Sequence, residues 1–177
     1  MLRPAAAKEY SIAAVARLTL PGPVAHYGPA VVLVLAALLL IAAEFMTVRE
    51  IRVVTVVPPE GTASGGSHHG FALAIVGLAM LPMTYGATVR GARPAAIALV
   101  VLALVAWAVI LLVDRPLLDD TGLIGRTYEL AEARPGPGFY VETVGAALAL
   151  VGAVAMLALR TEPVRPRRRA RPADDDD

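Results

Sequence analysis

Four long runs of apolar residues, separated by shorter polar segments, dominate the sequence. About 20 apolar residues in helical conformation are long enough to cross the hydrocarbon core of a bilayer, which is about 30 Å thick. The runs predict membrane-spanning helices at about Pro29–Thr47, Gly70–Val89, Pro94–Val113 and Gly138–Leu159. We therefore expect an all-α membrane protein, a four-helix transmembrane bundle with a short β-like segment in its first outer loop.

The composition of the chain agrees with this class. Hydrophobic residues make up 57% of its 177 residues and charged residues 18%, whereas a soluble domain has about 45–50% and about 25%. The chain has no cysteine, which excludes disulfides, thiol nucleophiles and thiolate zinc sites. We find no phosphate loop, dinucleotide fingerprint or zinc-protease motif. The sequence therefore does not favour an enzyme and predicts no cofactor.

Basic residues predict the orientation of the helices. The short connection Arg90–Arg93 makes the second and third helices an antiparallel hairpin, and alternate connections then place eleven Lys and Arg residues on one side and five on the other. The richer side faces the cytoplasm. Because Ala, Gly, Pro and Arg are abundant, as in GC-rich bacterial genomes, we expect a bacterial inner-membrane protein with both termini in the cytoplasm. About 28 residues precede the first apolar core, too many for an ordinary signal peptide, so we expect that helix to be retained.

Two polar ends flank the predicted transmembrane domain, residues 28–159. Residues 1–27 form a cytoplasmic segment that fits an interfacial helix and equally a partly ordered tail. Residues 160–177 are Arg-rich and then Asp-rich, and they predict a disordered cytoplasmic tail whose arginines attract anionic lipids by about 1 kcal/mol each. No aromatic platform accompanies these arginines, so we expect no nucleic-acid partner.

The first outer loop begins with the β-branched segment Thr47–Val57, which predicts a short strand. A strand needs a partner, and this one pairs either within the chain or with another protein. For the second case, the candidate partner-binding residues are Val53, Val54, Val56 and Val57. Residues 61–67 predict a flexible connector. The acidic second outer loop, 114–137, predicts a short helix at Thr127–Ala133.

Two histidines, His68 and His69, stand at the outer end of the second predicted helix. The acids expected in the same outer layer are Glu44, Glu142, Asp119 and Asp120. Imidazole together with carboxylate suits zinc or another divalent cation. Adjacent helical residues point about 100° apart, however, and an exposed histidine pair fits the sequence as well. We therefore assign no metal and keep the two histidines as the candidates for one.

Glu44 and Glu142 are predicted near the outer ends of the first and fourth helices. An acid buried among helices relays protons or holds cations, which makes these residues the candidates for an ion or proton relay. The structural alternative is that Glu142 interacts with the dipole at the start of its helix. In that case Glu44 pairs with an arginine, such as Arg49 or Arg126.

Small residues recur on one face of the fourth predicted helix. They are Gly145, Ala149, Gly152 and Ala153. Such a stripe lets two helices approach closely. The neighbour is either another helix of the same bundle, which we expect, or a second copy in a homo-oligomer.

The order of elements is similar to a group of actinobacterial four-span membrane proteins that includes a tryptophan-operon-associated class. The segment Pro135-Gly-Pro-Gly-Phe-Tyr140, at the entry to the last helix, looks like the corresponding approach in that class. The resemblance implies the four-span fold and brings no activity or site residues. Claudin-like proteins share the order of spans, but their outer-loop Trp and Cys signature does not occur in this sequence.

The sequence thus predicts an integral membrane accessory or assembly subunit that presents its outer loops to a partner membrane protein. The first alternative is a small-molecule or ion transporter that uses Glu44 and Glu142. The second is a metal-dependent membrane enzyme that holds its metal at His68 and His69.

Overall fold

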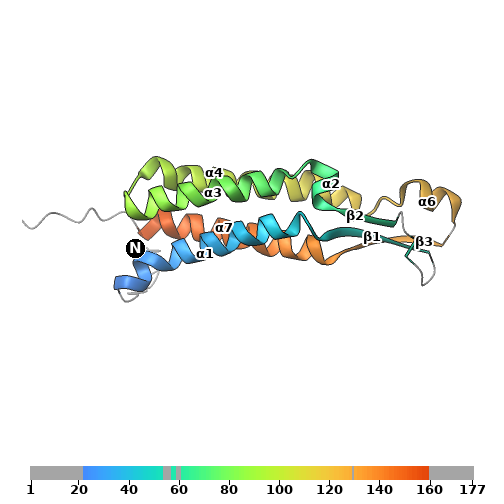
Figure 1. Ribbon diagram of the computed structural model, residues 1–177, viewed down its shortest axis with the longest axis horizontal. Helices are drawn as coiled ribbons and strands as arrows, with labels where there is room; N and C mark the ends of the chain where they lie inside the picture. The colour runs from blue at the N-terminus through green and yellow to red at the C-terminus, as the bar shows by residue number, and fades with distance from the viewer. Residues whose placement is uncertain (1–21, 54–56, 59–60, 129, 160–177) are drawn as a thin grey trace, which may run out of the picture.

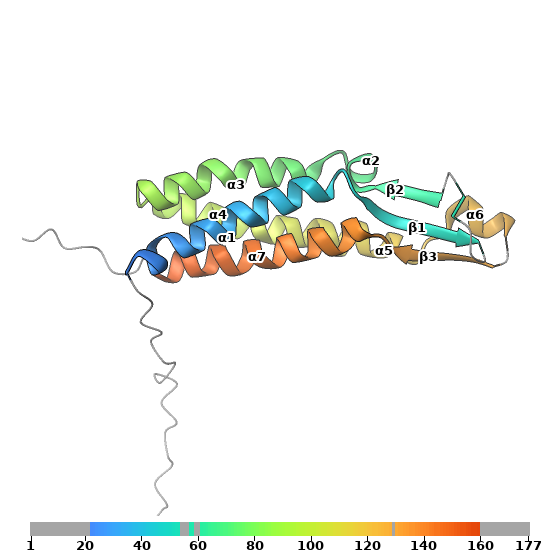
Figure 2. The same cartoon turned by 60° about the horizontal axis from the view of Figure 1, so that its bottom comes forward.

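Four long helices lie side by side in an antiparallel bundle, and a small sheet extends from one end of it (Figure 1, Figure 2). We call that end of the bundle the sheet end. This computed structural model describes residues 22–53, 57–58, 61–128 and 130–159, with only the backbone for residues 22–26. The bundle helices are α1 (Gly22–Ala43), α3 (Ala72–Val89), α4 (Arg93–Val109) and α7 (Pro137–Leu159).

Three helices of the described chain are long and apolar enough to cross a membrane, and they cover Ala72–Val89, Arg93–Thr127 and Pro137–Leu159. The second of these continues beyond α4 through a π-helical segment, η3 (Ile110–Asp114), and the short helix α5 (Arg115–Leu117). The shorter apolar helix Tyr27–Ala43 belongs to α1. The chain is therefore mostly helical and consistent with a multi-pass membrane protein.

Small residues set the spacing between α1 and α7. A Cβ atom added to Gly152 would lie 2.9 Å from Cγ of Leu33, and one added to Gly145 would lie 3.2 Å from Cγ of Leu40. Ala149 and Ala153, on the same face of α7, are fully buried. The structure thus places the small-residue stripe against α1 of the same chain, where the absence of larger side chains allows close van der Waals contact.

The sheet has three antiparallel strands in the order β2-β1-β3. These are β1 (Thr47–Val53), β2 (Thr62–Ser64) and β3 (Ala131–Pro135). The central strand, β1, pairs on both edges within the chain, and Val53 lies opposite Ala131. Val57 is half-buried, whereas Val54 and Val56 lie outside the described residues.

The sheet corrects several local predictions. The expected connector at 61–67 contains β2 and most of α2 (Gly65–His69), so a small sheet accompanies the mostly helical fold. The helix expected at Thr127–Ala133 is also wrong, because α6 (Gly122–Thr127) ends there and residues 131–135 form β3. Hydrogen bonding to β1 outweighs the local helical preference of this segment.

Differences at the ends of the spans are smaller. The first apolar helix ends at Ala43 instead of Thr47, because residues 44–46 turn the chain into β1. The third continues beyond Val113 through Asp114. The N-terminal segment 1–21 and the tail 160–177 lie outside the described residues.

Candidate metal centre

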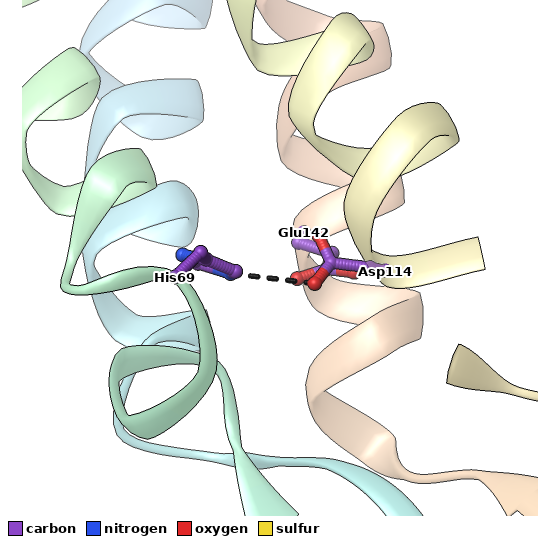
Figure 3. Close-up of side chains that lie close together, drawn as sticks. All are labelled: His69, Asp114 and Glu142. Atoms are coloured by element: carbon purple, nitrogen blue, oxygen red, sulfur yellow. Dashed lines mark ion pairs between the residues drawn. The ribbon is translucent and has the colours of Figure 1, made fainter. Parts of the chain in front are cut away.

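Four titratable side chains from four separate segments meet where the bundle joins the sheet. They are Glu44, His69, Asp114 and Glu142. The segments are the turn after α1, the end of α2, the end of η3 and the second turn of α7. Figure 3 shows His69, Asp114 and Glu142 directed toward one another from three of these segments.

His69 reaches the centre because the chain reverses immediately after it. Gly70 ends α2 in the left-handed conformation, with φ of 64°, and Phe71 follows with φ of 61° before α3 begins. Glycine adopts this conformation without the steric cost that a side chain adds. The side chain of His69 is 6% exposed, whereas the neighbouring His68 is exposed. The two histidines therefore do not form one site.

Asp114 is carried into the centre by the widened turn at the end of α4. It continues the buried face of that helix, and its side chain is fully buried. Pro116 cannot donate a backbone hydrogen bond to the preceding turn, which favours a wider turn just before it. Single π-helical turns of this kind occur frequently at functional sites. Asp114 was predicted as part of the second outer loop and not as a site residue.

Glu142 lies on the face of α7 that carries the small-residue stripe, and it is fully buried. Neither of its carboxylate oxygens has a hydrogen-bond partner among the described residues. Glu142 lies in the second turn of α7, beyond the first residues, whose backbone N–H groups have no partner within the helix. The expected interaction of Glu142 with its own helix N-terminus is therefore not the one found.

Glu44 instead caps a different helix. Its Oε1 accepts hydrogen bonds from the backbone N–H groups of Leu73, at 2.6 Å, and Ala74, at 3.1 Å. These are the second and third residues of α3, whose own preceding residue, Phe71, supplies no side-chain cap. The carboxylate thus satisfies two backbone donors that a helix start leaves free.

Arg49, one of the two arginines expected to pair with Glu44, has another partner. Nη1 of Arg49 donates to the backbone oxygen of Asp120 at 2.9 Å. Asp120 also accepts from the N–H of Gly122. Asp119 and Asp120 are exposed in the loop before α6 and do not join the buried centre.

The imidazole of His69 lies between two carboxylates. Its Nδ1 is 3.5 Å from Oε1 of Glu44, and its Nε2 is 3.4 Å from Oδ1 of Asp114. One potential ligand atom each from His69, Asp114 and Glu142 lie within 4.8 Å of one another. The group therefore brings one nitrogen and two carboxylates within reach of a common ion.

The electrostatics of the centre are dominated by acids. Three carboxylates face a single imidazole, and all four carboxylate oxygens of Asp114 and Glu142 lack a hydrogen-bond partner among the described residues. Burying a carboxylate without a partner is costly, and proteins offset that cost with protons, cations or metal ions. The arrangement is suited to a positively charged ligand.

His68, on the solvent side, has a different environment. Partial burial, together with the nearby His69 and Arg49, lowers the pKa of its imidazole below the usual value. Its ring centroid lies 6.5 Å from that of His69, at an interplanar angle of 83°, so the two rings point in different directions.

Comparison with known proteins adds no family to this description. No protein-family model, curated protein or solved structure matches the chain. The function is therefore argued from the centre itself.

Proposed function

We propose that this chain is a four-span membrane protein that binds one divalent transition-metal ion at His69, Asp114 and Glu142. The observation that carries the proposal is the convergence of three buried ligand groups from distant segments, with ligand atoms within 4.8 Å of one another. The carboxylate oxygens of Asp114 and Glu142 have no hydrogen-bond partner among the described residues. A dication would neutralise both acids and supply the missing interactions.

The donor set suits a divalent transition metal. Imidazole and carboxylate are both ligands of zinc, and the same donors also suit manganese and iron. Two ligands bound about 2.1 Å from a tetrahedral ion lie about 3.4 Å apart, and Nε2 of His69 and Oδ1 of Asp114 are separated by 3.4 Å. Calcium prefers six to eight oxygen ligands, which these three residues do not offer.

The four-span topology is part of the same proposal. The 22 residues of α1 give a helix about 33 Å long, enough to cross the hydrocarbon core. With the basic connections in the cytoplasm, both termini lie inside the cell and the sheet end faces outward. The centre would then take its ion from the outer side of the membrane.

The apolar bundle next to the centre is better suited to a protein that binds an ion than to one that transports ions across the membrane. Its core is apolar, and among the described residues the other buried polar side chains are Thr84 and Thr88 of α3. A relay across the membrane needs successive polar groups. Transport through Glu44 and Glu142 therefore stays a prediction, to be tested by ion flux into proteoliposomes with Glu142→Gln.

Metal titration tests the proposed function. The full chain is purified in detergent, without a histidine tag, treated with a chelator and titrated with Zn²⁺ by calorimetry. We expect one ion per chain, and loss of measurable binding in His69→Ala and Asp114→Asn. His68→Ala is the matched control, because that neighbouring side chain is exposed, and it should bind as the wild type does. A wild type that takes up no Zn²⁺, Mn²⁺ or Fe²⁺ would refute the proposal.

A role as an accessory or assembly subunit is a second candidate function. Large apolar side chains are exposed beyond the bundle, around α6 and the start of β3. They are Leu123 at 78%, Leu130 at 72% and Tyr128 at 52% exposure. Exposed apolar patches outside the bilayer mark surfaces that bind other proteins. An ion at the centre would support this role by holding α2 and α7, which follow β2 and β3, in place.

A further inference from the structure

The carboxylate of Glu44 is held rigidly. Its Oε1 accepts two backbone hydrogen bonds from the start of α3, the shorter one being the 2.6 Å bond from Leu73. The side chain is 1% exposed. Hydrogen bonds from backbone N–H groups to a carboxylate are charge-assisted and stronger than neutral ones. Glu44 therefore presents a fixed negative oxygen to its surroundings.

The helix that carries His69 is docked on the same turn. The backbone N–H of Gly66 donates to the backbone oxygen of Glu44 at 3.0 Å. A Cβ atom added to Gly65 would lie 3.1 Å from Oε2 of Glu44. The close approach of α2 therefore favours glycine at position 65, and it keeps His69 in register with Glu44.

The same Oε1 atom lies 3.5 Å from Nδ1 of His69. A neutral imidazole has one N–H, and the partner of that N–H decides which nitrogen keeps a free lone pair. Neither ring nitrogen of His69 has a hydrogen-bond partner among the described residues, so its contact with Glu44 is electrostatic. That contact favours a proton on Nδ1, which leaves the lone pair of Nε2 on the side of Asp114 and Glu142. Metal-binding histidines usually have such a carboxylate behind them, which orients the ring.

We propose that Glu44 is the positioning residue of the candidate metal centre, holding His69 through Nδ1 so that Nε2 faces the ion shared with Asp114 and Glu142. This inference rests on the proposed function. It also gives Glu44 a role distinct from the relay predicted from the sequence and from the capping of α3 alone.

Glu44→Gln separates positioning from capping. Glutamine keeps an oxygen that accepts from the N–H groups of Leu73 and Ala74, but it removes the charge behind His69. We expect Zn²⁺ to bind 10- to 100-fold more weakly, in line with other outer-shell carboxylates, with one ion per chain retained. Glu50→Gln, the same change at an acid of β1 whose partner is Arg52, is the matched control and should leave the affinity unchanged.

The orientation of His69 is measured without metal. In ¹⁵N spectra of the chelator-treated full chain, we expect the His69 tautomer protonated at Nδ1 in the wild type and a mixture of tautomers in Glu44→Gln. Unchanged Zn²⁺ affinity in a folded Glu44→Gln chain would overturn the inference. So would wild-type spectra that show Nε2 protonated, a result that does not require the variant to fold. If the wild type binds no metal but shows the expected tautomer, the proposed function fails and the positioning contact stands.

Discussion

Nε2 of His69 lies 3.4 Å from Oδ1 of Asp114, in a contact between a five-residue helix and the last residue of a π-helical segment. The first residue follows β2, and the second lies in the π-helical continuation of α4, just before α5. The contact therefore connects α2, which follows strand β2 of the sheet, to the helical run of α4, which forms a hairpin with α3. Any ligand of this pair would couple the stability of the sheet end to that of the bundle.

Removal of metal is expected to destabilise the protein. A ligand that binds only the folded state at one hundred times its Kd adds about 2.7 kcal/mol to the free energy of unfolding. The melting temperature should rise with Zn²⁺ and fall again with a chelator, followed by the fluorescence of Trp107, the single tryptophan. The melting temperature of His69→Ala should be the same with Zn²⁺ and with the chelator. A Zn²⁺-dependent rise that persists in this variant would place the ion elsewhere.

Neutralising Glu142 should stabilise the metal-free chain. Its two carboxylate oxygens are buried and have no hydrogen-bond partner among the described residues, so at alkaline pH, where the acid is ionised, Glu142→Gln removes a costly buried charge. We expect the free energy of unfolding to rise by about 1 kcal/mol or more, while stabilisation by Zn²⁺ is lost. Glu132→Gln, at an exposed acid of β3, should show neither effect. A less stable Glu142→Gln chain without metal would contradict this account.

The contact between α1 and α7 should tolerate no added side chain at Gly152. A Cβ atom there would lie 2.9 Å from Cγ of Leu33, so Gly152→Ala is expected to cost about 1–3 kcal/mol through overpacking. At Gly86 of α3 the nearest neighbour of an added Cβ is the Cβ of Ala95, at an ordinary 3.6 Å. Gly86→Ala should therefore leave stability unchanged or raise it by up to about 1 kcal/mol. Unfolding in mixed detergent micelles measures the free energy of unfolding of both variants. Equal losses of stability in Gly152→Ala and Gly86→Ala would argue against close helix packing as the cause.

The membrane topology can be mapped with single cysteines, since the natural chain contains none. We expect Leu123→Cys, at the sheet end, to react with an impermeant maleimide added outside intact cells. Arg90→Cys and Ala6→Cys should react only after the membrane is opened, because the predicted connection and N-terminus lie in the cytoplasm. External labelling of Ala6→Cys together with Leu123→Cys would show that α1 does not cross the membrane.

The accessory role predicts a partner that depends on the exposed apolar tip. Leu130→Asp should abolish stoichiometric co-purification of a membrane protein without lowering the melting temperature, because Leu130 is 72% exposed. Substitution of Val53 is a poorer test, since that residue pairs with Ala131 inside the sheet. The control is Leu112→Asn, an exposed residue of η3 within the predicted span. Unchanged co-purification with Leu130→Asp would count against this surface.

Local patterns predicted the helices well and the loops poorly. The runs that contain α3, α4 and α7 are confirmed as helices long and apolar enough to cross a membrane, because run length is a property of each segment by itself. The crossing of α1 stays a prediction. β3 was mistaken for a helix, since its strand conformation comes from pairing with β1, far away in the sequence.

The candidate centre was predicted only in part. The sequence predicts Glu44, His69 and Glu142 in one layer, where the two acids are also the candidates for a relay, and it predicts Asp114 as part of a loop. One signal for Asp114 was present, because it continues the spacing of three and four residues set by Ala103, Ala106 and Ile110 on the buried face. These helices are apolar on every side, however, so their sequences do not reveal which face is turned inward.

The sequence by itself determined the class of protein, because the length of an apolar run and the charges beside it act segment by segment. It also determined which residue types are available beside the sheet end. Only the tertiary structure decided that His69 turns inward while His68 turns out, and that Asp114 and Glu142 face the same imidazole. That outcome depends on the packing of four segments distant in sequence, through the reversal at Gly70, the widened turn of η3 and the close contact of α7 with α1.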